Sequence, residues 1–186
     1  VVVGNLPYGI TTDLVLWLLE QWRDVRRAVL LMQKEVAERL TAHPGDRKAG
    51  RMTLAVHYRM DVERILDVAP GSFRPIPKVT SSLVAFRPRA KTPVEPKDEA
   101  LFFRVIRAAY GERRKTLANA LSTGLHLPRT LIEQAIGEAG LAPQVRGERL
   151  TLEDFCRLAD LLGHAGPAEG RPEGASNPAP PDNQKA

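Results

Sequence analysis

The chain has 186 residues, of which 43% are hydrophobic, and it carries 27 Lys and Arg against 22 Asp and Glu. This content is too apolar for a wholly disordered chain, and the length suffices for one ordinary domain or two small ones. No apolar run approaches the ~18–20 residues of a membrane span, so we expect a cytoplasmic protein with no membrane segment. The one cysteine excludes an internal disulfide framework and a zinc cluster of several thiolates, and we expect no metal site.

The first half of the chain alternates predicted strands and helices. Val1-Val2-Val3-Gly4 is a β-branched run, typical of a strand buried on both faces inside a parallel sheet. Residues 52–58 fit a helix or a strand equally well. The spacing of apolar residues predicts helices over 12–22 and 36–40, and strands over 28–32, 62–68 and 83–87. This order predicts half of a doubly wound α/β sheet.

The composition predicts where this α/β unit begins and ends. A globular chain seldom starts inside its own central strand, so we expect a C-terminal piece of a longer protein, with residues 1–88 as part of the α/β domain. Residues 89–97 are polar and proline-rich, typical of a linker. Every apolar pattern in 98–163 has the helical period, which predicts a small all-helical domain. Residues 164–186 are rich in Gly, Pro and Ala, and we expect a disordered tail there.

Capping residues mark the ends of the predicted helices in the second unit. Asp98 is expected to cap the first of them, and Thr151, with Asp154 three residues later, the last. Gly124 and Gly140 are expected to end two of the helices between.

A short polar motif directly follows the valine-rich strand, where open α/β sheets bind their ligands. It reads Asn5-Leu6-Pro7-Tyr8 and suits methylation of an exocyclic amine on a nucleobase, whose delocalised lone pair makes it a poor nucleophile. The Asn5 side-chain oxygen and the Leu6 carbonyl can accept hydrogen bonds from that amine. Pro7 holds Leu6 extended and so fixes the direction of its carbonyl, while Tyr8 can stack on the base. The alternative is a strand end followed by an ordinary proline turn.

A second aromatic residue, Phe73, lies on a proline-stiffened stretch that runs to Val79. Two aromatic rings on loops could hold a flipped base between them. The alternative is a proline-rich hairpin with Phe73 in the core.

Basic side chains crowd one predicted helix and the turn after it. With a net charge of +5, such a cluster could follow RNA phosphates. The alternative is a solvated helix face balanced by neighbours such as Glu112. The cluster consists of Arg104, Arg107, Arg113, Arg114 and Lys115.

Five motifs together resemble one known family, the ribosomal small-subunit RNA adenine dimethyltransferases (the KsgA/RsmA family). The resemblance runs from Val1 to about Leu162. The motifs, in chain order, are Val3-Gly4-Asn5-Leu6-Pro7-Tyr8, Met32-Gln33-Lys34-Glu35-Val36-Ala37, Phe73 to Val79, Arg113-Arg114-Lys115-Thr116 and Arg146-Gly147-Glu148-Arg149-Leu150.

The resemblance implies an α/β fold, with the C-terminal half of a Rossmann-like class I methyltransferase sheet followed by a small helical RNA-binding domain. It implies S-adenosylmethionine as methyl donor and dimethylation of N6 on two adjacent adenines in the 3′-terminal hairpin loop of small-subunit (16S) rRNA. The partner would be the pre-30S ribosomal subunit, bound by a monomer during ribosome biogenesis.

The resemblance also implies roles for single residues. Asn5 and Leu6 would accept from the target amine, Asn5 would lie beside the methyl donor, and Tyr8 and Phe73 would stack on the base. The family's glycine-rich donor loop precedes the Asn-Leu-Pro-Tyr strand, and this sequence contains no Gly-x-Gly. We therefore expect these 186 residues to lack most of the donor pocket and to be inactive by themselves.

Two other functions compete with this one. A related large-subunit rRNA adenine N6-methyltransferase of the macrolide-resistance type is a close rival, although Leu6 and the Arg113 to Thr116 stretch favour the small-subunit group. The other is a non-catalytic RNA-binding module of ribosome assembly that uses the helical domain alone.

Overall fold

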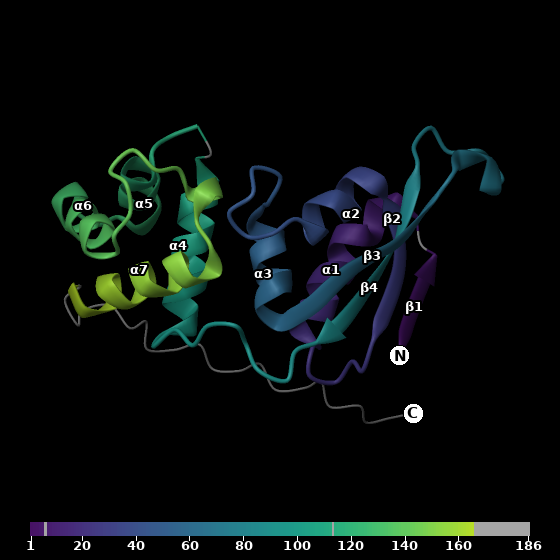
Figure 1. Ribbon diagram of the computed structural model, residues 1–186, viewed down its shortest axis with the longest axis horizontal. Helices are drawn as coiled ribbons and strands as arrows, with labels where there is room; N and C mark the ends of the chain where they lie inside the picture. The colour runs from purple at the N-terminus through teal and green to yellow at the C-terminus, as the bar shows by residue number, and fades with distance from the viewer. Residues whose placement is uncertain (6, 113, 166–186) are drawn as a thin grey trace, which may run out of the picture.

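The computed structural model describes residues 1–5, 7–112 and 114–165, which form a mixed α/β part followed by a helical part (Figure 1). The sheet part comprises β1 (Val2–Asn5), α1 (Thr11–Glu20), β2 (Ala28–Gln33), α2 (Lys34–Thr41), α3 (Arg51–Arg59), β3 (Met60–Val68) and β4 (Ser81–Pro88). The helical part comprises α4 (Glu99–Gly111), α5 (Leu117–Leu125), α6 (Arg129–Glu138) and α7 (Leu152–Ala165). Short 3₁₀ turns are η1 (Tyr8–Ile10), η2 (Pro70–Ser72) and η3 (Gly147–Arg149).

The sheet has the strand order β1-β2-β4-β3 within the described residues. β1 and β2 are parallel, whereas β4 is antiparallel to both of its neighbours, β2 and β3. Asn5 pairs with Leu31, and Ser81 pairs with both Gln33 and Val68. The carboxyl ends of β1, β2 and β3 therefore lie at one edge of the sheet, together with the start of β4.

The predicted strands and helices of the first half are confirmed, and residues 52–58, which fitted either type, lie in helix α3. The burial expected for the first strand is wrong in this chain. Val2 packs against the core of the sheet part, whereas Val3 points to the opposite face and is 76% exposed, and Val1, before the strand, is 83% exposed. A β-branched run favours a strand, but burial on both faces also needs neighbours that this chain does not place there.

The core of the sheet part lies between the strands and the helices α1, α2 and α3. Leu18 of α1, Leu40 of α2 and Val56 of α3 contribute to the same buried cluster as Leu30 of β2 and Phe86 of β4. All five side chains are at most 2% exposed. Burial of this apolar surface, worth roughly 25 cal/mol per Å², holds the three helices on the sheet.

The helical part has its own core, and the two helix-start caps predicted for it, Asp98 and Thr151, are confirmed. Phe102, Leu121 and Phe155 are completely buried in it. The Asp98 carboxylate accepts a hydrogen bond from the Leu101 backbone N–H at 2.9 Å. At the start of α7, Thr151 Oγ1 accepts from the Asp154 N–H at 3.2 Å, while Asp154 accepts from the Thr151 N–H at 3.0 Å. These reciprocal bonds satisfy backbone donors that a helix start leaves unpaired.

Helix α3 joins the two parts, because its faces belong to different cores. Val56 lies in the core of the sheet part, whereas Leu54 and Tyr58 lie in the core of the helical part. The division into 1–88 and 98–163 stays a prediction, and two such units would meet at α3. Helix α7 continues to Ala165, two residues into the stretch predicted as a tail, and 166–186 lie outside the described residues.

Of the two glycines expected to end helices, one prediction is right and one is wrong. Gly140 has a φ of +74°, as a residue just after a helix often does, and it follows α6. Gly124 lies inside α5, which ends at Leu125 and is followed by His126 in the left-handed conformation. A Cβ at Gly124 would lie 2.6 Å from the Cβ of Ala108, so the missing side chain is what allows α5 to approach α4 closely.

Two glycine-to-alanine substitutions should therefore change stability in opposite directions. Gly124→Ala should lower the free energy of unfolding by about 1–3 kcal/mol, the usual cost of overpacking a tight contact. A Cβ at Gly137, inside α6, would meet nothing within 4 Å, so Gly137→Ala should raise stability by about 0.5–1 kcal/mol through better helix propensity. Urea unfolding, monitored by circular dichroism, measures the change in the free energy of unfolding for both substitutions. If the two changes were equal, they would contradict the close approach of α5 to α4.

Candidate functional site

The tip of β1 carries the first part of the predicted site. Asn5 is the last residue of β1 and is exposed. Pro7 is also exposed, and its carbonyl accepts a hydrogen bond from the Ile10 N–H at 3.2 Å, which closes the turn between β1 and α1. Leu6 and the side chain of Tyr8 lie outside the described part of the chain; the backbone of Tyr8 begins η1.

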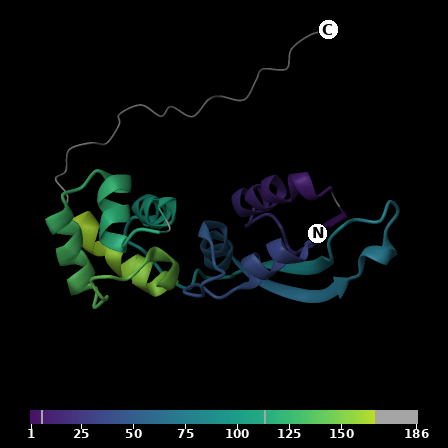
Figure 2. The same ribbon diagram turned by 90° about the horizontal axis from the view of Figure 1, so that it is seen from above.

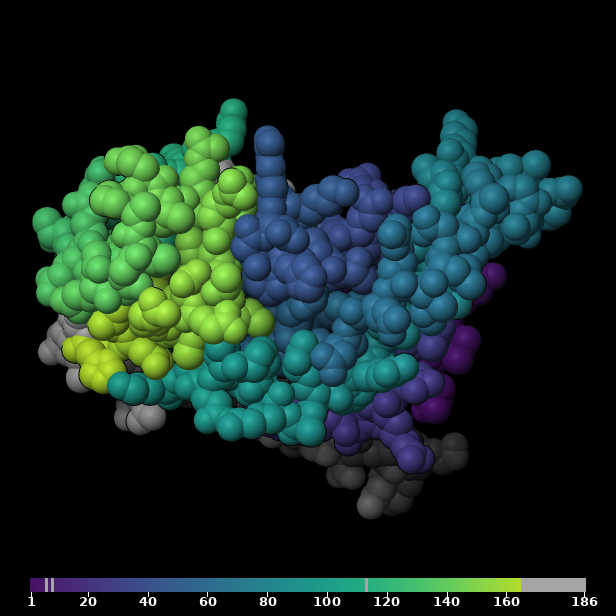
Figure 3. Space-filling view, viewed as in Figure 1, coloured from purple at the N-terminus to yellow at the C-terminus, as the bar shows by residue number. Residues whose placement is uncertain are grey.

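Phe73 lies on the connection between β3 and β4, which emerges from the same sheet edge as Asn5. This connection, 69–80, projects from the body of the molecule at the upper right of Figure 3. Phe73 follows η2, where its N–H donates to the Pro70 carbonyl at 3.2 Å. The ring is half-buried and belongs to neither core cluster, which argues against the interpretation as a core residue.

The sheet therefore brings Asn5 and the Phe73 connection to one edge, with β2 lying between β1 and β4. Neighbouring strands lie about 4.8 Å apart, so the end of this connection that enters β4 lies roughly 10 Å, or two strands, from the tip of β1.

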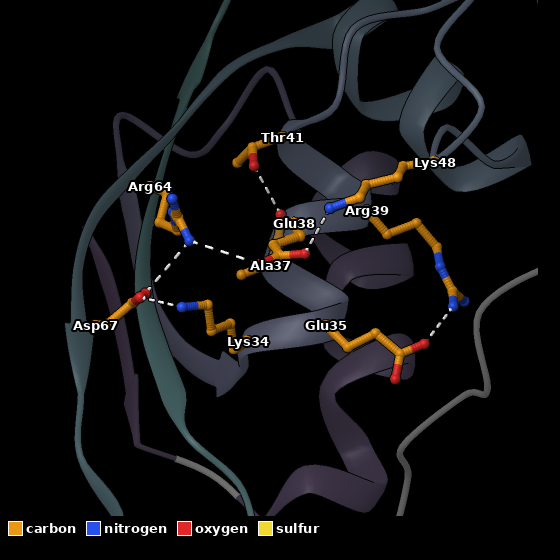
Figure 4. A network of polar contacts seen from close by, with 9 residues as sticks. All are labelled: Lys34, Glu35, Ala37, Glu38, Arg39, Thr41, Lys48, Arg64 and Asp67. Atoms are coloured by element: carbon orange, nitrogen blue, oxygen red, sulfur yellow. Dashed lines mark hydrogen bonds and ion pairs between the residues drawn. The ribbon is translucent and has the colours of Figure 1, made fainter.

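A group of charged residues that the sequence did not single out lies beside this edge (Figure 4). Asp67, near the end of β3, accepts a hydrogen bond from the Lys34 ammonium at 2.7 Å and another from the buried Ser82 hydroxyl at 2.7 Å. Arg64 lies 3.5 Å from the same carboxylate. Hydrogen bonds from Lys34 and then Ser82 hold the pKa of the Asp67 carboxyl below its ordinary value. A basic residue just after one predicted strand and an acidic residue near the end of another were the sequence signal for this pair.

Lys34 holds both ends of the connection that carries Phe73. Its side chain contacts Asp67, at the end of β3, and its backbone N–H donates to the carbonyl of Thr80, just before β4, at 3.0 Å. Because Lys34 is the first residue of α2, these bonds fix the base of the loop relative to β2 and α2. The loop tip is thus presented from an anchored base.

The basic residues predicted to contact RNA are only partly brought together. Arg104 and Arg107 of α4 are exposed and line a cavity of about 350 Å³ with Thr123 and Gly124 of α5. Arg114 is exposed, and Lys115 forms an ion pair with Glu112, so its charge is partly balanced. Arg113 lies outside the described residues.

Neither a membrane span nor a metal cluster occurs in residues 1–165, with 6 and 113 left aside. No helix in this part is both long and apolar enough to cross a bilayer. No group of three or more His, Cys, Asp and Glu side chains there could hold a metal ion.

Replacing Asp67 by Asn should lower stability at neutral pH and change the response to acid. The pKa of the Asp67 carboxyl is lower in the folded chain than its ordinary value of 3.8. The ionised carboxylate therefore stabilises the folded chain fully above pH 3.8, and this stabilisation is lost as the pH falls through the lowered pKa of the folded chain. We expect a lower urea midpoint for Asp67→Asn at pH 7, with the gap to the parent closing in acid. Glu63→Gln, exposed on the same strand, is the control and should change little. A gap that stayed constant into acid would contradict the assigned interaction.

Comparison with known proteins places this geometry in a family. The family model described as ribosomal RNA adenine dimethylase matches residues 1–163. Over 163 residues the chain is 41% identical to "Ribosomal RNA small subunit methyltransferase A" of Lachnoclostridium phytofermentans, which covers 87% of this chain and 56% of that protein. Over 164 residues it is 42% identical to the protein of the same name from Bacillus mycoides, with the same two coverages. The chain thus spans about half the length of the curated relatives it matches.

Two solved structures share the fold. The 23S rRNA methyltransferase ErmE superposes with a TM-score of 0.66 and 26% identity over 87% of this chain and 64% of that one. A dimethyladenosine transferase from Plasmodium falciparum superposes with a TM-score of 0.64 and 25% identity over 84% of this chain and 64% of that one. The Rossmann-like class I methyltransferase fold expected from the motifs is confirmed, and the chain belongs to the ribosomal RNA adenine dimethylase family.

Proposed function

We propose that this chain supplies the base-binding edge and the helical RNA-binding part of an S-adenosylmethionine-dependent rRNA adenine N6,N6-dimethyltransferase. Its substrate would be the pair of adjacent adenines in the 3′-terminal hairpin loop of small-subunit rRNA. The observation that carries the proposal is 41–42% identity, over 87% of the chain, to proteins named small subunit methyltransferases. The protein would act as a monomer on the pre-30S subunit in the cytoplasm.

The chemistry assigned to the sheet edge needs few groups. The Asn5 side-chain oxygen and the Leu6 carbonyl accept from the adenine amine, which favours a pyramidal nitrogen with an available lone pair. Tyr8 and Phe73 stack on the base after it leaves the loop, where bases are already partly unstacked. The anchoring of the base of the Phe73 connection by Lys34 supports this role, because it limits where the ring can lie relative to the sheet.

The methyl donor would be held mainly by residues other than these. When bound, S-adenosylmethionine supplies an electrophilic methyl group. Asn5, exposed at the tip of β1, is the residue of this chain that would contact it. The sequence has no Gly-x-Gly, the loop pattern that approaches such donors closely.

Calorimetric titration with S-adenosylmethionine tests this division of the site. The 186-residue chain should give no measurable binding, because a single asparagine cannot replace a donor loop. A version extended to the length of the curated relatives should bind. Tight binding by the 186 residues alone would contradict the assignment.

Substitutions at the sheet edge test the catalytic role in the extended version. Asn5→Ala should lower kcat for methylation of isolated small subunits by about 10²-fold or more, as removal of a transition-state hydrogen bond does. Phe73→Ala should weaken RNA binding by about 1–3 kcal/mol, because the base would no longer stack on the ring. Ile76→Ala is the matched control, since Ile76 is 61% exposed on the same connection.

The same assay separates the two competing functions. A non-catalytic assembly module would show no methyl transfer for these substitutions to reduce. The similarity to ErmE favours, as the second candidate, an enzyme of the large-subunit type. Such an enzyme would methylate isolated large subunits instead.

A further inference from the structure

A second cleft lies away from the strand tips, between the sheet part and the helical part. It has a volume of about 740 Å³ and is lined by residues of α1, α3 and α4. Seen from above, α3 lies between α4 on one side and α1 on the other (Figure 2). Helix α1 starts at the tip of β1, but the cleft is lined by its second half and by the residues after it, from Leu16 to Arg23. A ten-residue helix spans about 15 Å, so this cleft is a place separate from the base-binding edge.

The lining has an excess of positive charge. Four arginines face two glutamates, Glu20 and Glu99. Arg59 is already engaged, by an ion pair with Glu99 at 2.9 Å. The other three make no ion pair with any residue that the structure describes: Arg23, Arg51 and Arg107. Unpaired guanidinium groups around a cleft favour an anionic ligand, and phosphate suits their planar fork.

The cleft also offers flat surfaces. The half-buried Trp22 lies under the guanidinium of Arg23, which is 4.9 Å from its ring centroid. Phe103 of α4 also lines the cleft and is half-buried, with the guanidinium of Arg59 over its ring, 4.7 Å from the centroid. Nucleobases stack on such rings and on arginine planes, and the volume suits a ligand of nucleotide size. Phosphate-binding and base-stacking groups thus occur in one cavity.

Arg107 connects this cleft with the cavity of about 350 Å³ between α4 and α5. It lines both, and the second cavity is also lined by Arg104 and Glu112. A row of cations that runs from one cavity into the other matches a strand with phosphates at regular intervals better than a single small anion.

We propose that this cleft binds a nucleotide of single-stranded rRNA other than the methylated adenines, with phosphates at Arg51 and Arg107 and a base on Trp22. The proposal rests on the proposed function for the nature of the partner. It adds a second point of attachment, at which the enzyme would hold rRNA outside the target loop.

Tryptophan fluorescence of the 186-residue chain reports on the cleft directly. The chain has two tryptophans, and Trp17 does not line the cleft, so Trp17→Phe leaves Trp22 as the sole reporter. In this background, titration with an eight-nucleotide oligoadenylate should quench the fluorescence of Trp22 until the signal saturates. Arg51→Gln and Arg107→Gln should each weaken the binding several-fold and reduce the slope of its salt dependence by about 0.7 for each phosphate that is no longer neutralised. Arg26→Gln, an exposed arginine near Arg23 that does not line the cleft, should have no such effect.

Three results would overturn the proposal. In the first, fluorescence anisotropy shows that a dye-labelled oligoadenylate binds, while the fluorescence of Trp22 does not change. In the second, Arg26→Gln weakens binding as much as Arg51→Gln. In the third, adenosine monophosphate saturates the Trp22 signal at the same concentration as the oligonucleotide, which would make the cleft a mononucleotide site. Circular dichroism confirms that each variant is folded.

Failure of this proposal and failure of the proposed function are distinguishable. If the extended version methylates small subunits but the fluorescence of Trp22 does not change, the cleft is excluded as an RNA-binding site and the proposed enzymatic function is retained. If Trp22 responds as expected but no methyl transfer occurs, the cleft stands as an RNA site and the enzymatic proposal fails. Phe73→Ala, at the other site, should leave the Trp22 response unchanged.

Discussion

The hydrogen-bonded insertion of β4 between β2 and β3 decides where the connection that carries Phe73 lies relative to Asn5. Because β4 runs against both neighbours, its start meets the ends of β2 and β3, and Ser81 pairs with both Gln33 and Val68. The connection from β3 must then emerge at the edge where β1 ends. Without this reversal Phe73 and Asn5 would have no reason to share an edge of the sheet.

Electrostatics then fixes the loop on this frame. Lys34 reaches Asp67 with its side chain and Thr80 with its backbone, so one residue ties together the end of β3, the start of β4 and the start of α2. The buried Ser82 hydroxyl donates a second hydrogen bond to the Asp67 carboxylate. An exposed ion pair alone contributes little, but a hydrogen bond from a buried partner gives this one a defined geometry.

The packing of the two parts depends on α3, whose opposite faces are buried in different cores. Tyr58 packs edge-on against Phe103 of α4, with ring centroids 5.2 Å apart, and Arg59 lies over Phe103 and pairs with Glu99. These interactions seat α4 beside α3 and leave the arginine-lined cleft between them. The cleft is thus a consequence of how the parts pack, whereas the edge proposed to bind the base is a consequence of the sheet.

The sequence by itself determined the elements that local interactions decide. Apolar periods located the helices and strands, Asp98 and Thr151 marked helix starts through their own side-chain bonds, and the Asn-Leu-Pro-Tyr motif marked the strand tip. Gly124 was misassigned, because a glycine that ends a helix and one that admits a neighbouring helix look the same in one dimension.

Only the tertiary structure decided what depends on residues far apart in the chain. The exposure of Val3, the pairing of Lys34 with Asp67 and the meeting of Arg51 with Arg107 across a cleft each require the packed chain. Local propensity and periodicity act over a few residues, whereas strand neighbours and the seating of α4 beside α3 are set by the burial of apolar surface over the whole molecule.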